Sequence, residues 1–394
     1  MTPRTGSARP IAPPDGTVVI AADKFKGSLA AAEVAERVAA GLARGGFTGT
    51  TVAVPVADGG DGTVTAALGA GFRRAEAKVH GPAADLVTAG YALRDEVAVI
   101  EAAQACGLTL LPPGRLAPLT ATSRGVGELI LAARRAGARR IVLGVGGVAT
   151  TDGGAGMLQA LGARLIDETA RELPPGGGPL ARLAAVDLTG LADLSEVEFL
   201  LASDVDNPLL GPAGAAAVYG PQKGASRDQV PLLEAGLRRW ADLAEAGAAE
   251  AGAVPGPVRD APGAGAAGGL GFAALLFLRA RMRPGIELLL DLAGFGSRLD
   301  GARLVITGEG SLDAQTLHGK APVGVARAAA AHQPPVPVVA VAGRCTLTAA
   351  QLRAAGIAHA YPLTGIEPDP ARCMAQAGPL LELLAARIAA DWLG

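Results

Sequence analysis

The first residues that could carry chemistry lie in a turn at the end of an apolar run. Thr17 to Asp23 (TVVIAAD) has the composition of a buried strand, and the turn KFKGSL follows it before a segment of helical periodicity. Ligands of parallel α/β sheets bind beyond the carboxyl ends of the strands, so this turn is in position for function. Lys26 and Ser28, beside a helix N-terminus, are suited to bind a carboxylate or a phosphate. The alternative is that Ser28 caps the helix and the lysines are solvated.

A second turn repeats this arrangement. The apolar run TVAVPVAD ends at Asp58, and the sequence GGDGT that follows it places Gly59 and Gly60 between Asp58 and Asp61. Paired glycines let backbone amides approach a ligand closely, and the two carboxylates can bind Mg²⁺ or orient a substrate hydroxyl. This composition is also typical of ordinary turns. The matching Asp23 at the end of the first strand favours the functional interpretation.

Two glycine-rich segments in the middle of the chain have the composition of phosphate-binding loops. LGVGGVATTDGGAG (143–156) follows a strand-like run and opens a helix, and its hydroxyls and carboxylate fit a loop that surrounds a phosphate. PGAGAAGGLG (262–271) has similar glycine spacing without a preceding strand. The nucleotide-binding candidates from these two segments are Gly146, Gly147, Thr150, Asp152, Gly263, Gly265, Gly268 and Gly269.

The first of these segments leaves a dinucleotide-binding alternative open. Gly144, Gly146 and Ala149 have the spacing of the dinucleotide fingerprint, and the acidic Asp167 follows 18 residues after Ala149. An NAD-dependent hydroxyacid dehydrogenase would explain these glycines but not the two aspartate-containing turns. Because glycine makes up 56 of the 394 residues, such matches are weak evidence.

A further strand-like run ends in a group of oxygen ligands. ASDVDNPLLG (202–211) contains Asp204 and Asp206 together with Asn207, the single asparagine of the chain. Alternating carboxylates beside an amide suit a divalent metal ion, and an Asx-turn before Pro208 is the alternative. The segment GPQKGA follows and supplies Lys223 as another nucleotide-binding candidate.

The last polar segment is TGEGSLDAQTLHGK (307–320), which contains Glu309, Asp313 and Lys320. It is not a Walker loop, because Ala321 follows Lys320 where serine or threonine is required. Lysine is rare in this chain, with five lysines among 35 basic residues, and of these five only Lys78 lies outside the segments described above. Arginine cannot replace a compact ammonium at a phosphate without changing the geometry, which favours function for the other four.

The elements that must position these segments follow two patterns. At both ends of the chain, apolar strand-like runs alternate with helical segments, which indicates a doubly wound parallel sheet of flavodoxin-like size. The middle predicts a second, mixed α/β domain inserted into the first. We expect a disordered tail over 1–15, the flavodoxin-like α/β domain over 16–71 and 298–394, and the inserted domain over 72–297, with the active site in the cleft between them. The expected strands cover 17–23, 51–58, 86–93, 97–102, 140–145, 197–204, 303–309, 336–343 and 359–364.

Composition excludes several classes of protein. The 35 basic and 37 acidic residues give a net charge of −2 without blocks of like charge, so neither nucleic acid nor an anionic membrane is an expected partner. Three scattered cysteines and four histidines predict neither a disulfide framework nor a zinc site. The amino terminus lacks the apolar stretch of a signal peptide, so we expect a cytoplasmic protein. The uncharged run 261–278 contains proline and glycines and predicts a buried helix rather than a membrane span.

Taken together and in order, these segments resemble the type-1 glycerate kinase family. The segments that carry the resemblance are ADKFKGSL, PVADGGDGT, ATSRGVGELI, GVGGVATTDGGAGMLQALG, SDVDNPLLGPAGAA, YGPQKGA, PGAGAAGGLG and LVITGEGSLDAQTLHGKAPVGVA. The resemblance implies ATP-dependent phosphorylation of D-glycerate with Mg²⁺, and 2-phosphoglycerate as the product. It also implies a flavodoxin-like domain interrupted by a second α/β domain. The chain departs from the family pattern at Lys24, Val148, Thr151 and Ser311, which puts nucleotide affinity or donor preference in question.

Motif position and chemistry then give each candidate a role. We expect Lys26, Asp58 and Asp61 to be catalytic, and Asp204 and Asp206 to bind the metal. The expected substrate-binding residues are Asp23, Ser28, Gly59, Gly60, Glu309, Asp313 and Lys320, and the nucleotide-binding residues are Lys223 and the glycine-loop residues named above. The expected partners are D-glycerate and ATP, with the protein as a monomer or homodimer. A non-catalytic protein that binds a small acid is a further alternative.

Overall fold

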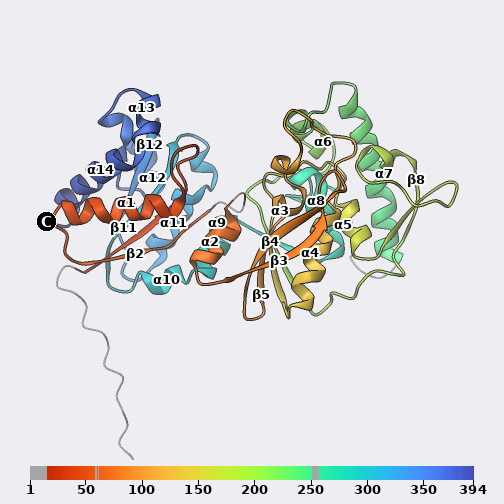
Figure 1. Ribbon diagram of the computed structural model, residues 1–394, viewed down its shortest axis with the longest axis horizontal. Helices are drawn as coiled ribbons and strands as arrows, with labels where there is room; N and C mark the ends of the chain where they lie inside the picture. Colours follow the sequence, from red (N-terminus) through yellow and green to blue (C-terminus); the bar gives the residue numbers. More distant parts are fainter. Residues whose placement is uncertain (1–15, 58–59, 61, 251–256) are drawn as a thin grey trace, which may run out of the picture. The chain divides into compact units, whose positions relative to one another are not determined.

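The computed structural model describes residues 16–57, 60, 62–250 and 257–394. The chain forms two compact units (Figure 1). One unit contains the residues up to Val56 together with Leu290–Gly394, and the other contains Ala57–Leu289. The first unit is therefore built from both ends of the chain, and the second from its middle.

The first unit contains a parallel sheet with the strand order β13-β12-β11-β1-β2. Numbered along the chain within this unit, the order is 2-1-3-4-5, which is the flavodoxin-like order, so the predicted doubly wound sheet is confirmed. The second strand is shorter than expected because Pro55 cannot donate to a strand ladder. The strands are β1 (Thr17–Ala22), β2 (Thr50–Ala53), β11 (Ala302–Leu312), β12 (Val338–Cys345) and β13 (His359–Pro362).

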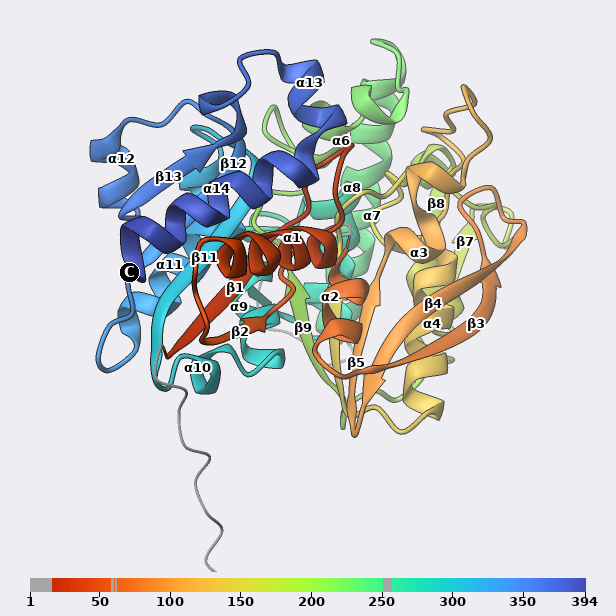
Figure 2. The same ribbon diagram turned by 60° about the vertical axis from the view of Figure 1, so that its left-hand side comes forward.

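Two helices from opposite ends of the chain cover one face of this sheet. Figure 2 shows α1 (Ala31–Arg44) beside α14 (Ala377–Trp392), and both helices contribute to a hydrophobic cluster with β1, β11 and β12. Alternate residues of β1, including Val18 and Ile20, lie in this cluster. The remaining helices of the first unit are α10 (Phe295–Arg298), α11 (Ala321–Ala331), α12 (Ala349–Ala354) and α13 (Pro370–Ala375).

The second unit contains a mixed six-stranded sheet with the order β10-β9-β6-β5-β4-β3. Strands β5, β6, β9 and β10 are parallel, whereas β3 and β4 are joined to them as antiparallel neighbours. A separate antiparallel pair is formed by β7 and β8. The strands are β3 (Arg73–His80), β4 (Leu86–Arg94), β5 (Val97–Glu101), β6 (Arg140–Gly144), β7 (Arg164–Asp167), β8 (Leu183–Asp187), β9 (Glu198–Ala202) and β10 (Arg281–Arg283).

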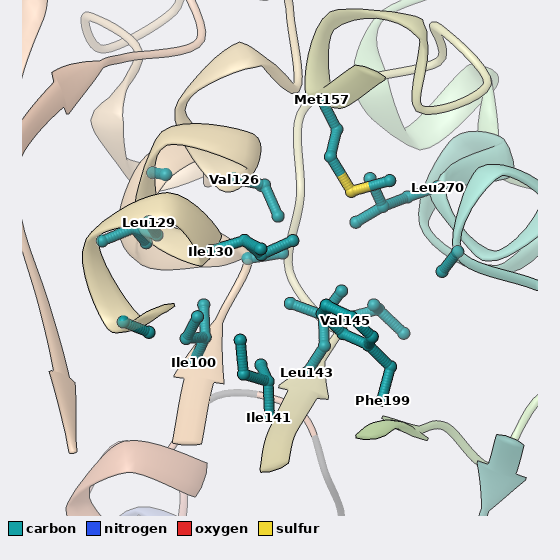
Figure 3. Close-up of a cluster of buried hydrophobic side chains, with 14 of the residues drawn as sticks. Ile100, Val126, Leu129, Ile130, Ile141, Leu143, Val145, Met157, Phe199 and Leu270 are labelled. Carbon is teal, nitrogen blue, oxygen red and sulfur yellow. The ribbon is translucent and has the colours of Figure 1, made fainter. Parts of the chain in front are cut away.

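A hydrophobic core joins this sheet to its helices (Figure 3). Ile100 and Leu143 of the central strands pack with Ile130 of α4 (Arg124–Arg135) and Met157 of α5 (Ala155–Ala160). A second cluster surrounds Trp240 of α7 (Gln229–Glu250). The other helices are α2 (Thr63–Gly69), α3 (Ala103–Cys106), α6 (Ala215–Tyr219) and α8 (Ala266–Phe277), and α9 (Gly285–Leu292) contains the boundary between the units.

The first boundary between the two units lies at Val56 in the structure, earlier in the chain than the expected residue 71. The reason is that α2 packs on β4 and β5 of the second unit. The backbone N–H of Val64 donates to the buried Glu101 carboxylate at 2.6 Å. Arg94 donates to the Ala70 carbonyl at 2.8 Å. The second boundary falls at Leu289, ahead of the expected residue 297.

The apolar run over 261–278 forms a loop and the buried helix α8, as its glycines and proline predict. In the parts of the chain that the structure describes, no helix has both the length and the hydropathy required to cross a membrane.

Two glycines inside helices provide a matched test of the packing between α1 and α14. A glycine-to-alanine change inside a helix stabilises a protein by about 0.5–1 kcal/mol when the methyl group has room. Gly247 of α7 has this room, because the nearest atom to its added Cβ, Leu188 Cδ1, lies at 3.7 Å. A Cβ on Gly41 of α1 would overlap the carbonyl oxygen of Glu382 in α14. We therefore expect Gly247→Ala to raise the thermal unfolding midpoint, and Gly41→Ala to destabilise by about 1–3 kcal/mol. Equal shifts in calorimetry would contradict the close helix contact.

Candidate functional site

A pocket of about 400 Å³ opens in the second unit, beyond the carboxyl ends of two parallel strands. Its walls are Val145–Val148, which follow β6, and Ala202–Val205, at the end of β9. Tyr219 and Lys223 line it from α6 and the short helix after it, and Ala266 and Ala267 from the start of α8. The volume is within the usual range of small-molecule sites, and the position is where open α/β sheets bind ligands. This is the strongest candidate ligand site of the second unit.

Hydrogen bonds to the Asp152 carboxylate hold the loop after β6 in place. This carboxylate is buried and accepts hydrogen bonds from Ser123 N and Oγ at 2.8 and 2.9 Å, and from the N–H groups of Gly154 and Gly156 at 3.1 and 3.3 Å. Burial raises the pKa of Asp152, and these hydrogen bonds oppose the shift. The carboxylate thus fixes the loop to the start of α4. Its expected contact with a nucleotide stays a prediction, since all four bonds run to the protein itself.

Lys223 is a buried cation beside this loop. Its side chain is almost fully buried, and its ammonium donates to the Thr150 carbonyl oxygen at 2.5 Å. Burial lowers the pKa of Lys223 to about 8, while the nearby Cys106 and Asp152 oppose the shift. Within the described residues no carboxylate forms an ion pair with this ammonium. Lys223 is therefore a desolvated positive charge at a pocket wall.

The glycine segment that leads into the first turn of α8 packs closely against neighbouring backbone. Gly265 N–H donates to the Asn207 carbonyl at 2.8 Å, and Gly153 N–H donates to the Gly268 carbonyl at 3.0 Å. Gly268 has φ +70°, and a Cβ there would overlap the Thr150 carbonyl oxygen and lie 2.8 Å from Lys223 Nζ. The structure buries all four predicted glycines of this segment, Gly263, Gly265, Gly268 and Gly269. The pocket is instead lined by the neighbouring alanines, and Ala267 adopts the left-handed conformation at φ 55°.

The acidic segment after β9 lies at the rim of the same pocket. Asp204 and Asp206 are exposed, and Asp204 Oδ1 accepts a hydrogen bond from Gly285 N–H at 3.2 Å. Asn207 accepts from the Tyr219 hydroxyl at 2.6 Å, which fixes the ring of Tyr219. Among the described residues, no three His, Cys, Asp or Glu side chains lie close enough together to hold a metal ion.

A second cluster of predicted residues lies in the first unit, at the carboxyl ends of β1 and β11. The two strands are neighbours, and Asp23 N–H donates to the Gly308 carbonyl at 2.8 Å. Glu309 is nearly buried, accepts a hydrogen bond from Thr316 Oγ1 at 2.5 Å, and lies 3.8 Å from Lys320 Nζ. The strand pairing thus brings Asp23 and Glu309 to one edge of the sheet, and the ion pair with Glu309 places Lys320 beside them.

Asp313 belongs to the same cluster. Its carboxylate accepts hydrogen bonds from Ser311 Oγ at 3.1 Å and from Gln315 N–H at 2.9 Å. Desolvation opposes the shift, but these hydrogen bonds and the Lys320 charge lower the pKa of Asp313. Ser311 Oγ in turn accepts a hydrogen bond from Arg344 Nε at 2.9 Å. Arg344 of β12 thus brings a guanidinium to this cluster, at one of the positions where the chain departs from the family pattern.

The turn after β1 differs from the expectation that it borders a helix N-terminus. Helix α1 begins at Ala31 and its cap position is Ala30, whose N–H donates to the Glu33 carboxylate at 2.8 Å. Ser28 is not the cap, because its hydroxyl donates to the Phe25 carbonyl at 3.1 Å. Lys26 is exposed. An anion at this turn would therefore meet the Lys26 ammonium rather than the free amides of a helix end.

Of the residues predicted in the second turn, the structure describes only Gly60. Asp58, Gly59 and Asp61 lie outside the described residues. Gly60 lines the pocket of the second unit, and its carbonyl accepts from Thr63 Oγ1 at 2.7 Å. Sequence reasoning also missed residues of the pocket and its supports. Ser123 and Tyr219 lie in the motifs ATSRGVGELI and YGPQKGA but were not assigned a role, and Cys106 and Trp240 lie in no motif.

The dinucleotide alternative is not supported by the topology. In a Rossmann unit, the strand after the glycine loop and helix returns beside the first strand and carries the acid that binds ribose. Here the next strand, β7, pairs with β8 in a separate sheet. Asp167 at its end accepts from the backbone N–H groups of Thr169 and Arg171 at 2.8 and 3.1 Å. This carboxylate closes a turn of the β7–β8 pair.

Comparison with known proteins now decides the family. The profile described as the glycerate kinase family matches residues 18–393, which is nearly the whole chain. The chain belongs to the glycerate kinase family. The proteins of this family are phosphotransferases, and a kinase requires a nucleotide as its second substrate. The resemblance seen in the sequence motifs is therefore confirmed.

Individual relatives agree with this assignment. The chain is 47% identical over 331 residues to glycerate kinase of Bacillus subtilis, covering 83% of this chain and 84% of the relative. It is 43% identical over 334 residues to glycerate 2-kinase of Escherichia coli, covering 84% and 85%. A crystal structure assigned as glycerate kinase 2 from Salmonella typhimurium matches with a TM-score of 0.82 and 40% identity, covering 95% of this chain and 97% of the other.

The packing of Gly268 against Thr150 and Lys223 gives a second prediction. A left-handed alanine costs about 1–2 kcal/mol, and Gly268→Ala adds a clash with the Thr150 carbonyl. We expect Gly268→Ala to destabilise by clearly more than this, and to change the fluorescence of Trp240, whose indole N–H donates to the Gly153 carbonyl at 3.0 Å. Gly137 has φ +97° with no atom within 4 Å of its added Cβ, so Gly137→Ala is the matched control. Urea unfolding would refute the packing if the two variants lost equal stability.

Proposed function

We propose that this protein phosphorylates D-glycerate with ATP and Mg²⁺ and releases 2-phosphoglycerate and ADP. The observation that carries the proposal is the family match over residues 18–393, which includes the candidate sites of both units. The name of the Escherichia coli relative, glycerate 2-kinase, supports the 2-phosphate as the product. The pocket and the charged cluster supply the two kinds of site that a kinase requires.

The proposed nucleotide site is the pocket of the second unit. Gly146 and Gly147 lie at its wall, where the absence of a side chain would let the backbone approach a phosphate closely. Lys223 offers a positive charge to the phosphates, and Thr150 and Asp152 hold the loop in place from behind. The buried glycines around the start of α8 allow close packing of the backbone next to the pocket. They act as support rather than as contacts.

Asp204 and Asp206 are the proposed ligands of Mg²⁺. Both are exposed carboxylates on the loop after β9, and Asp204 lines the pocket. Two carboxylates suffice, because Mg²⁺ is commonly held by one or two carboxylates with the substrate's phosphates. When bound, the ion would neutralise charge on the phosphates during transfer.

The proposed glycerate site is the cluster at the ends of β1 and β11. The carboxylate of glycerate would bind the cationic groups of Lys26 and Lys320, with Ser28 beside them. Asp23, Glu309 and Asp313 would accept from substrate hydroxyls, because ionised carboxylates are acceptors only. Asp58 and Asp61, with Gly59 and Gly60 between them, would orient the reacting hydroxyl and receive its proton.

A product assay tests the whole proposal. Purified protein with MgATP and D-glycerate is expected to form ADP only when glycerate is present, and removal of Mg²⁺ is expected to abolish turnover, since transfer needs charge neutralisation. Phosphorus NMR is expected to show 2-phosphoglycerate. ADP formation independent of glycerate would refute the kinase assignment, and a spectrum with only the 3-isomer would refute the regiochemistry. Binding of glycerate without turnover would favour the alternative of a small-acid binding protein.

Replacement of Lys26 tests the glycerate site. A charge-assisted contact contributes about 1.5–3 kcal/mol, so Lys26→Ala is expected to lower kcat/KM by roughly 10- to 100-fold. Stability is expected to change little, because Lys26 is exposed. Lys26→Arg is also expected to be impaired, since a guanidinium does not reproduce the position of a compact ammonium.

Lys78 provides the control, because it is an exposed lysine on the edge strand β3, which contributes no residue to either candidate site. Lys78→Ala is expected to have wild-type kinetics. Near-normal kinetics of both Lys26 variants would exclude a role of Lys26 in substrate binding, and a large loss of thermal stability in Lys26→Ala would make its role structural.

A further inference from the structure

Among the residues that the structure describes, the buried ammonium of Lys223 has no anionic partner, which such a group normally has in a protein interior. It has three N–H donors, and the structure gives it one acceptor, the neutral carbonyl oxygen of Thr150 at 2.5 Å. A buried charge without an ionic partner is strongly unfavourable, and proteins normally pair it. Lys223 nevertheless lies at a pocket wall, where a ligand could provide the missing charge.

The titratable groups around Lys223 do not replace that counter-charge. Asp152 interacts with Lys223 through space, but the hydrogen bonds to its carboxylate come from the start of α4 and its own loop. Cys106 of α3 is buried, and burial with the nearby Asp152 raises the pKa of its thiol, so it stays neutral. On the pocket side, Asp204 is exposed at the rim, and the Tyr219 hydroxyl donates to Asn207. The Cys106 thiol and the Tyr219 hydroxyl are neutral, and the Asp152 carboxylate accepts its hydrogen bonds from other groups. Among the described residues, the ammonium therefore has no direct contact with an anion.

We propose that Lys223 is the charged group that binds a phosphate of the nucleotide in this pocket, and that nucleotide binding adds a proton to its side chain. The proposal rests on the nucleotide site proposed above and specifies how that site recognises its ligand. A phosphate oxygen carries the negative charge and the lone pairs that the remaining N–H donors require. The binding step is therefore coupled to proton uptake from the solvent.

The sign of the coupling follows from the charge states. In the free protein, burial lowers the pKa of Lys223 to about 8, so above this pH the amine is mostly neutral. A bound phosphate favours the charged form and raises the pKa of Lys223. Between the two values, binding takes up a proton, and affinity falls as the pH rises through about 8. Well below that pH the amine is already charged, and affinity is independent of this group.

Titration calorimetry with β,γ-methylene ATP and Mg²⁺ measures this coupling without turnover. The binding enthalpy is compared in buffers of different ionisation enthalpy, at pH ~8.5 and pH ~6.5. The slope gives the protons taken up, and we expect about 0.5 to 1 at the higher pH and near zero at the lower one. Excess Mg²⁺ keeps the terminal phosphonate of the analogue ionised at the higher pH, so the uptake comes from the protein.

Lys223→Met removes the amine while keeping an unbranched side chain, and Lys78→Met is the matched control on the exposed face of β3. We expect Lys223→Met to weaken binding roughly 10- to 100-fold at neutral pH and to abolish the proton uptake, and Lys78→Met to change neither. Unchanged affinity or unchanged uptake in Lys223→Met would overturn the proposal.

The wild-type measurement keeps the proposal falsifiable if Lys223→Met fails to fold. Wild-type protein that binds the analogue without proton uptake at the higher pH would overturn the role of Lys223 while leaving the nucleotide site intact. Wild-type protein that does not bind the analogue at either pH would refute the nucleotide site itself, and the proposal with it.

Discussion

The geometry of the pocket depends on how one loop of the second unit, Thr150–Gly154, is held by hydrogen bonds. Lys223 binds the carbonyl of Thr150, and Trp240 binds the carbonyl of Gly153. Asp152 fixes the loop to the start of α4, and the Gly153 N–H binds the carbonyl of Gly268. Four parts of the chain thus meet at a few backbone atoms. Such contacts need short distances, which explains why side chains are missing at the points of closest approach.

The first unit places its polar residues by a different principle. Its strands are parallel, and the central strands β1, β11 and β12 are largely buried, so the carboxyl ends lie at one edge of the sheet. Register then decides which residues become neighbours: Ala22 pairs with Gly308, which sets Asp23 and Glu309 side by side. Neither residue needs a special local conformation for this. A cluster from distant parts of the chain follows from the pairing of two apolar strands.

Those features of the fold that depend on local residue patterns could be predicted from the sequence. The apolar runs at both ends predicted the five parallel strands. The motifs contain the charged residues of both candidate sites, but of the residues that line the pocket they predicted only Gly60, Gly146, Gly147, Asp204 and Lys223. The pattern failed for β3, RRAEAKVH, because its charged residues hide the alternation on an exposed edge strand, and for the short strands β7, β8 and β10. Burial was not predictable either. Nothing local distinguishes Lys223, buried by the glycines of α8, from the exposed Lys26, because the difference arises from segments distant in the sequence.

The insertion of one unit into the other sets an order of folding during synthesis on the ribosome. Strand β1 pairs on one side with β2 and on the other with β11, with Thr17 opposite Ala302. A two-stranded pair is marginal in water, so the apolar β1 must wait until the last third of the chain has emerged. The second unit is continuous and can complete its core first. The nascent protein therefore carries an unpaired, strongly apolar amino-terminal strand for most of its synthesis, a state that favours engagement by chaperones.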